Sequence, residues 1–254
     1  MADPTAASVD TSARAGTGSN GTRVLGVASI LLVAALVLFG LVLTDPAPPP
    51  PEGQGDSMRL IYVHVPAAMM MYIPFTLTLV GSIVWLVKRS VWWDTVAGAA
   101  AEIGVVLTAM CLVTGSLWGR PTWGTYWDWD PRLTSTALMF LVYLGYLAIR
   151  RIPADVEVRN RRAAVVGIAG FVNVPIVHFA VDWWRSLHQD ATIGTLDVKI
   201  QGLQLFTLFL GFVAFGVTTA WLLLHRFRLA WLEDRADEAL LEAAIEARRA
   251  EASL

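Results

Sequence analysis

The sequence predicts an all-α polytopic membrane protein, a bundle of six transmembrane helices. Of its 254 residues, 56% are hydrophobic and only 16% are charged, whereas soluble domains carry roughly 25% charged residues. The mean hydropathy of +0.56 agrees with this class. A transmembrane helix needs about 20 mostly apolar residues to cross roughly 30 Å of hydrocarbon. Six segments meet this requirement: residues 24–43, 65–87, 94–115, 133–149, 163–184 and 203–224.

The first segment follows a tail, residues 1–20, that is rich in Ala, Ser, Thr and Gly and is expected to be disordered. A cleaved signal peptide is the alternative interpretation of residues 24–43. However, this apolar stretch is longer than a usual signal-peptide core, and no Ala-x-Ala-like cleavage site follows it. We therefore expect an uncleaved anchor, and a membrane domain that covers residues 21–226.

The lysines and arginines near the span ends predict the orientation, because they favour the cytoplasmic side of a membrane. Five of the 19 lie on one side, which leaves 14 on the side that also holds both termini. Both termini are therefore predicted to be cytoplasmic. The outer side then holds the connections 44–64, 116–132 and 185–202. Its five basic residues are Arg59, Arg120, Arg132, Arg185 and Lys199.

Two further segments have a distinctive composition. Consecutive prolines within residues 46–56 favour a stiff, extended connection. Residues 227–254 alternate acidic and basic residues with Ala and Leu, which predicts a charged cytoplasmic helix.

Composition also excludes several function classes. The net charge of −2 and the basic residues in short loops exclude a nucleic-acid partner. The only lysines, Lys88 and Lys199, each follow a valine, so the chain has no Walker A motif and cannot itself hydrolyse ATP. The single cysteine, Cys111, allows no internal disulfide and no Cys-x-x-Cys pair, and the chain has no motif for covalent haem attachment.

The predicted outer connection at residues 116–132 concentrates aromatic side chains. It holds four of the 11 tryptophans of the chain, namely Trp118, Trp123, Trp127 and Trp129. Tryptophans also form belts at membrane interfaces, but a belt spreads over many span ends, whereas these crowd into one short connection. Stacked aromatic faces cover a large conjugated ring that stays partly in water. We therefore expect a flat apolar ligand here.

Two histidines are predicted to flank this connection. His64 lies just before Pro66, a residue typical of the first helical turn, which puts His64 at the outer mouth of the second span. His188 lies about 25 residues beyond Ala163, or roughly 37 Å if the chain stays helical, which is past the hydrocarbon. Two outer imidazoles from separate spans are what a six-coordinate haem iron requires, one on each porphyrin face.

Other polar residues allow two interpretations. His178, inside the fifth span, is either a packing group or a hydrogen-bond partner of a ligand, and His225 is interfacial. The outer arginines match the carboxylates of haem propionates. Contacts with lipid headgroups or with Asp128, Asp130 and Asp182 explain any one of them equally well. The position of Arg132 in the connection favours it for the propionate role.

Three sequence blocks resemble the CcmC family of haem-handling proteins. The run WGRPTWGTYWDWDPRLTS at residues 118–135 is similar to the tryptophan-rich WWD signature of that superfamily. The other two blocks are RLIYVHVPAA at residues 59–68 and NVPIVHFAVDWWRSLHQ at residues 173–189. The likeness covers about residues 57–225 and leaves out the N-terminal tail, the proline-rich connection and the charged C-terminal helix.

This resemblance implies haem b, held without a covalent bond on the outer side of the inner membrane, with His64 and His188 as axial ligands. The implied partners are the periplasmic haem chaperone CcmE, the ATP-binding cassette subunits CcmA and CcmB, and the small subunit CcmD. Taken with the residue types, the expected cofactor-binding residues are His64, His188, Trp118, Trp123, Trp127, Trp129, Asp130 and Arg132.

Three function classes are compatible with these features. We favour a module that presents haem to CcmE with little or no chemistry of its own. A haem exporter or permease subunit is the alternative, and it requires a polar path through the spans, for which only Asn173, His178, Glu102 and Asp182 are candidates. A membrane cytochrome requires a second histidine pair on the inner side, where His225 stands alone in the sequence.

Overall fold

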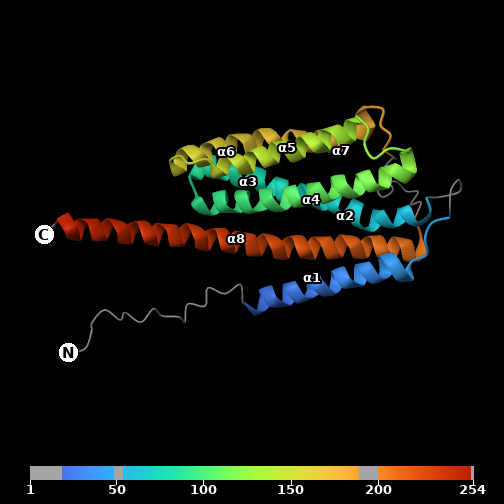
Figure 1. The fold of residues 1–254 in the computed structure, drawn as a ribbon, viewed down its shortest axis with the longest axis horizontal. Helices are drawn as coiled ribbons and strands as arrows, with labels where there is room; N and C mark the ends of the chain where they lie inside the picture. The colour runs from blue at the N-terminus through green and yellow to red at the C-terminus, as the bar shows by residue number, and fades with distance from the viewer. Residues whose placement is uncertain (1–18, 49–53, 189–199, 253–254) are drawn as a thin grey trace.

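The computed structural model describes residues 19–48, 54–188 and 200–252, and within these ranges the chain is helical and has no strand (Figure 1). The elements are α1 (Asn20–Leu38), the π-helical turn η1 (Phe39–Leu43), the 3-10 helix η2 (Gly55–Leu60), α2 (Ile61–Met70), α3 (Tyr72–Lys88), α4 (Val91–Trp123), α5 (Pro131–Arg151), α6 (Val156–Phe171), α7 (Asn173–Trp183) and α8 (Gly202–Ala252). Six segments are long and apolar enough to cross a membrane: Asn20–Leu43, Gly55–Lys88, Val91–Trp123, Pro131–Arg151, Val156–Trp183 and Gly202–Ala252. The predicted all-α fold with six spans is therefore confirmed.

Two of the six spans are divided into two helices, and a proline explains each division. A proline has no N–H to donate to the carbonyl four residues earlier, so it interrupts a helix at that point. Four residues before Pro74 is Met70, the last residue of α2. Four residues before Pro175 is Phe171, the last residue of α6. The short helices α2 and α7 form the parts of these spans away from the C-terminal end of α8, and the longer helices α3 and α6 form the other parts (Figure 1).

Helix α4 is longer than the sequence predicts. The expected connection begins at residue 116, but α4 continues to Trp123, so the connection shrinks to residues 124–130. The helix ends at Gly124, whose φ of +82° lies in the left-handed region that glycine adopts without strain. Trp118 and Trp123 thus stand on the last turns of a helix, while Trp127 and Trp129 belong to the connection.

Helix α8 contains both the sixth span and the predicted charged helix. Its 51 residues run without a break, which at about 1.5 Å per residue is far more than the roughly 30 Å of hydrocarbon requires. From Glu233 onward every described residue is exposed, and Figure 1 shows this part of α8 extending beyond the other helices. The start of α1 lies at the same end of the bundle. We call this end the N/C end, and the opposite end the cavity end.

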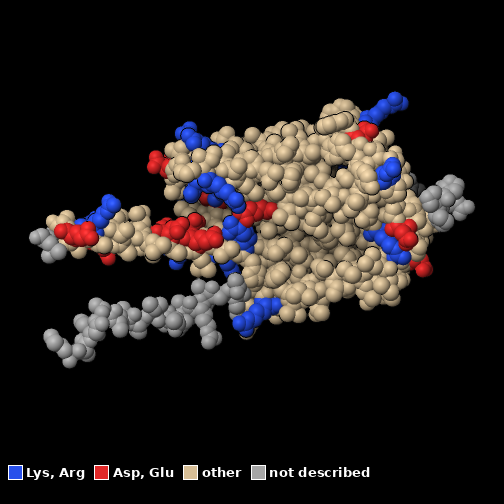
Figure 2. All heavy atoms as spheres, viewed as in Figure 1, with Lys and Arg blue, Asp and Glu red and all other residues tan. Residues whose placement is uncertain are grey.

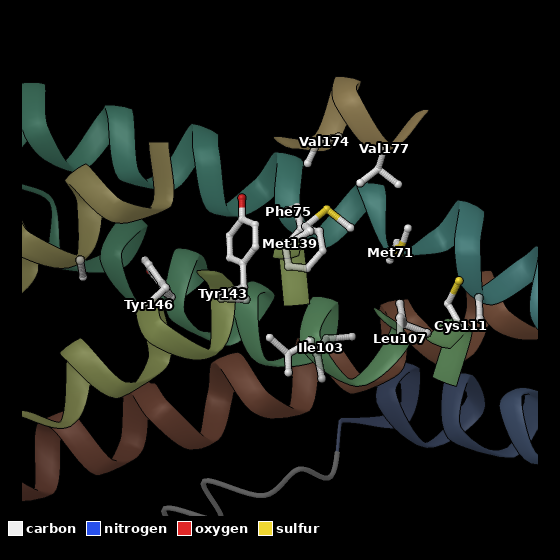
Figure 3. Packing of buried hydrophobic residues seen from close by; sticks show 14 residues of the cluster. Met71, Phe75, Ile103, Leu107, Cys111, Met139, Tyr143, Tyr146, Val174 and Val177 are labelled. Atoms are coloured by element: carbon white, nitrogen blue, oxygen red, sulfur yellow. The ribbon is translucent and has the colours of Figure 1, made fainter. Parts of the chain in front are cut away.

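The core of the bundle lies between these two ends. The ring of Phe75 from α3 stacks on that of Tyr143 from α5, with centroids 3.9 Å apart, and Met139 lies beside them with no exposed surface (Figure 3). Apolar side chains of α2 to α7 complete the cluster. Helix α1 packs mainly on α8, where the hydroxyls of Ser29 and Thr218 lie 2.7 Å apart.

Charged side chains gather toward the two ends of the bundle on the face that Figure 2 shows, and the surface between them is largely uncharged. Apolar residues of the spans such as Val113, Leu141 and Phe209 are more than half exposed. Such a band fits the hydrocarbon of a membrane.

Candidate functional site

A cavity opens at the cavity end, where α2, α4, α5 and the segment after α7 come together. It is partly open to solvent. Its lining is mostly apolar and aromatic, with few polar groups. The sequence-predicted residues in the lining are His64, His188, Trp118, Trp123, Trp127 and Arg132.

His64 stands on α2 with its imidazole almost fully buried. Its Nδ1 lies 3.1 Å from the carbonyl oxygen of Cys111 and 3.1 Å from the hydroxyl of Thr114. A carbonyl oxygen only accepts hydrogen bonds, so Nδ1 carries a hydrogen and donates it. In the neutral imidazole this leaves the lone pair on Nε2, the arrangement in which histidine binds a metal.

His188 reaches the same cavity from a segment that is not helical. Helix α7 ends at Trp183, and Trp184 is already extended, so His188 does not continue the helix that the sequence analysis considered. The main-chain N–H of His188 donates to the hydroxyl of Ser186 over 3.0 Å. The imidazole lies 6.3 Å from the ring of Trp123 between centroids.

The two imidazoles lie close together across the cavity. Their ring centroids are 6.4 Å apart and their planes differ by 33°. A metal–imidazole bond is about 2 Å long and the ring centre lies roughly 1 Å beyond the bonding nitrogen, so two imidazoles on opposite sides of one metal ion have centres about 6 Å apart. The separation therefore suits one metal ion between two histidines.

Metal ions in proteins are usually held by histidine, cysteine, aspartate and glutamate side chains. Among the described residues, no group of three or more such side chains is placed to hold an ion. Two imidazoles suffice for a metal that already has four in-plane ligands, and a porphyrin supplies those four.

Three of the four predicted tryptophans line the cavity, and the fourth does not. Trp118 is buried, meets His64 edge-on at 5.7 Å, and donates from its indole nitrogen to the side-chain oxygen of Gln54. Trp123 and Trp127 are partly exposed in the lining. Trp129 is 80% exposed and outside the lining, although it meets Trp127 edge-on at 5.8 Å.

Of the two charged residues predicted for the site, one lines the cavity and the other does not. The guanidinium-bearing Arg132 lines the cavity at the first turn of α5. Asp130 is 4% exposed and lies outside the lining. Its carboxylate accepts hydrogen bonds from main-chain N–H groups, so it has no group turned toward a ligand.

The other candidate polar residues lie elsewhere. Arg59 donates to Asp56 and to the carbonyls of Gly40 and Thr44, which ties η2 to the end of the first span. Arg120 donates to the carbonyl of Gly124, and Arg185 is exposed. His178 packs edge-on against Tyr72, and His225 packs against Trp221 of α8.

Sequence reasoning missed the face of α4 that lines the cavity. Gly115 approaches His64 so closely that an added Cβ would lie 2.9 Å from Cε1 of the imidazole. Cys111, Gly115 and Trp118 line the cavity together and follow the three- and four-residue spacing of one helix face. That spacing is the signal that identifies them, provided the helix is known to continue past residue 116.

Comparisons with known proteins support one family. The model of the family described as heme exporter protein C matches residues 13–242. A heme exporter protein C from Bradyrhizobium diazoefficiens is 41% identical over 180 residues, which is 69% of this chain and 68% of that protein. Its namesake from Haemophilus influenzae is 35% identical over 212 residues, 82% and 83% of the two chains. A "putative cytochrome c biosynthesis ccmC-like mitochondrial protein" from Marchantia polymorpha is 39% identical over 166 residues, 65% and 70% of the two chains. The chain belongs to the heme exporter protein C family, CcmC.

Proposed function

We propose that this protein binds haem b in the cavity, with His64 and His188 as axial ligands, and presents it to the haem chaperone CcmE for cytochrome c maturation. The observation that carries the proposal is the pair of imidazoles 6.4 Å apart inside an aromatic cavity. The family supplies the class of ligand, since its members handle haem in cytochrome c biogenesis.

The residues of the lining fit the parts of a haem group. Trp118, Trp123 and Trp127 offer aromatic surface for the apolar porphyrin. Arg132 offers a guanidinium that pairs with a propionate carboxylate in a bidentate way. Because the cavity opens to solvent, one edge of the ligand stays accessible to a partner protein.

We favour presentation over transport through the bundle. A permease requires a polar path between the two ends of the bundle. Between them lie the apolar cluster around Phe75, Met139 and Tyr143 (Figure 3) and a further cavity between α1, α2, α4 and α8 whose lining is almost wholly apolar. The described helices therefore offer no polar path for the charged propionates of haem.

We propose that the cavity faces the periplasm and that the protein lies in the inner membrane. Basic side chains at the N/C end, such as Arg150, Arg159 and Arg226, support a cytoplasmic location for that end. The ATP-binding cassette subunits CcmA and CcmB and the small subunit CcmD are the proposed membrane partners. Of the predicted tail, residues 1–20, residues 1–18 lie outside the described residues, and Asn20 already belongs to α1.

The test is to replace the two histidines by alanine, singly and together, and to record the visible spectrum and haem content of the purified protein. We expect each single variant to lose the six-coordinate low-spin spectrum and the double variant to lose nearly all haem. His225→Ala, at the N/C end, is the control and should retain the wild-type spectrum. A double variant with normal haem content and spectrum would refute the proposal.

Presentation is tested separately by co-purification with CcmE. Haem should reach the chaperone when the wild-type protein is present and should fail to do so with the double histidine variant. Transfer that is unaffected by the double variant would contradict the assigned ligands.

A further inference from the structure

Asp130 uses its two carboxylate oxygens for two different parts of the protein. Oδ2 caps the start of α5, where it accepts from the N–H groups of Arg132 at 2.9 Å and Leu133 at 3.4 Å. An aspartate before a helix that begins with proline is a common cap. Oδ1 accepts from the N–H of Leu187 at 2.7 Å. The first role is local, and the second joins residues 57 positions apart in the sequence.

The second hydrogen bond fixes the main chain immediately before His188. Helix α7 ends at Trp183, the N–H of Trp184 still donates to the carbonyl of Ala180, and residues 185–188 are not helical. The bond from Leu187 ties this segment to the connection 124–130, which carries Trp127. It therefore joins the two walls of the cavity that contribute an imidazole and an indole.

We infer that Asp130 is a positioning residue for His188, acting through the N–H of Leu187, and does not itself contact the ligand. The inference rests on the proposed role of His188 as a haem ligand. Burial of the carboxylate strengthens the bond, because charge-assisted hydrogen bonds are stronger where water is excluded. The aspartate of the tryptophan-rich signature thus affects the proposed porphyrin site indirectly, through the position of His188.

Asp130→Asn separates the two roles of this side chain. Asparagine is as good a helix cap as aspartate, but its amide has one accepting oxygen, and its NH₂ group only donates. If that oxygen keeps the cap, the NH₂ group faces the N–H of Leu187 and the second bond is lost. If Asp130 only caps α5, the Asp130→Asn variant should behave as the wild type. If Asp130 positions His188, the variant should have a displaced His188.

The experiment compares purified wild type, Asp130→Asn and Asp128→Asn. Asp128 is exposed in the same connection, so its variant controls for the loss of a nearby charge. We expect Asp130→Asn to unfold at nearly the wild-type temperature but to lose the low-spin haem spectrum in most molecules. Added imidazole should restore that spectrum by occupying the vacated axial position. Asp128→Asn should match the wild type.

Hydrogen exchange of the haem-free proteins provides a readout that does not depend on the ligand. We expect the peptide that covers residues 184–188 to exchange about tenfold faster in Asp130→Asn, while the first turn of α5 keeps its protection. Wild-type exchange in that peptide, or a wild-type haem spectrum in Asp130→Asn, would overturn the inference. A wild-type protein that binds no haem would instead overturn the proposed function, and the exchange rates would still decide the role of Asp130.

Discussion

The two ends of the bundle each contain a cavity, and the two linings differ in chemistry. At the N/C end the lining is polar, and Arg150 binds both carboxylate oxygens of Asp94 at 2.7 and 2.8 Å. Arg226 pairs with Glu102 in the same region. At the cavity end the lining is aromatic and carries two histidines.

The chemistry of the two linings distinguishes the two cavities. At the N/C end the pairs Arg150–Asp94 and Arg226–Glu102 join α4 to α5 and α4 to α8. At the cavity end His64 uses one ring nitrogen for a main-chain carbonyl, which leaves the lone pair of the other nitrogen outside this bond. We therefore assign a structural role to the pairs at the N/C end and propose ligand binding at the cavity end.

The largest expected effect comes from breaking a pair at the N/C end. Asp94→Ala leaves Arg150 largely buried without its carboxylate, and removal of one partner from a buried pair costs about 3–5 kcal/mol. Thermal unfolding of the purified protein in detergent should show this loss. The haem spectrum of the protein that remains folded should stay at wild type, because the pair lies at the opposite end from the cavity.

A second pair at the same end provides the control. Arg89 and Glu157 lie 3.8 Å apart with both side chains largely exposed, and exposed pairs contribute little. Glu157→Gln should leave the unfolding temperature unchanged. An altered haem spectrum in Asp94→Ala would show that the two ends do not act independently.

The contrast between the ends is only partly visible in the sequence. Apolar runs of about 20 residues identify all six spans, since span length depends only on local composition. Clustering of tryptophans and two nearby histidines identifies the cavity end. Pro74 and Pro175 each lie four residues after a helix end, but Pro66 and Pro121 lie inside α2 and α4, so a proline alone does not predict a helix break.

Which residues face the cavity is not a local property. Trp127 and Trp129 are two residues apart, yet only Trp127 enters the lining. The partner of Asp130 lies 57 residues away, so no spacing rule identifies it. Arg59 is also an outer arginine of the type that pairs with a propionate, but carbonyls at the end of the first span bind it. Which residues face the cavity, and which partners they bind, depends on how the helices pack together.

A smaller but more selective effect is expected from Gly115→Ala. The new Cβ would lie 2.9 Å from Cε1 of His64, and overpacking of this kind costs about 1–3 kcal/mol. If the imidazole rotates to relieve the clash, this cost corresponds to about 5- to 150-fold weaker haem binding. Haem titration followed by absorbance measures this change. Gly145→Ala in α5, where an added Cβ meets nothing within 4 Å, should bind haem as the wild type does. Equal haem affinities for the wild type, Gly115→Ala and Gly145→Ala would contradict the prediction that Gly115 leaves the space that the imidazole of His64 occupies.

The smallest expected effect concerns two tryptophans at the cavity end, Trp123 and Trp129. Trp123 lines the cavity beside His188, whereas Trp129 is 80% exposed outside the lining. Trp123→Ala should weaken haem binding about tenfold, since one aromatic contact contributes about 1 kcal/mol beyond the apolar area that it buries. Trp129→Ala removes an equally large indole from the same signature, so the pair is matched in chemistry and differs in position. Its haem affinity, measured by the same titration, should stay within about twofold of the wild type. Equal losses in the two variants would mean that the tryptophans bind haem as a set, and that the lining seen in the structure does not define the site.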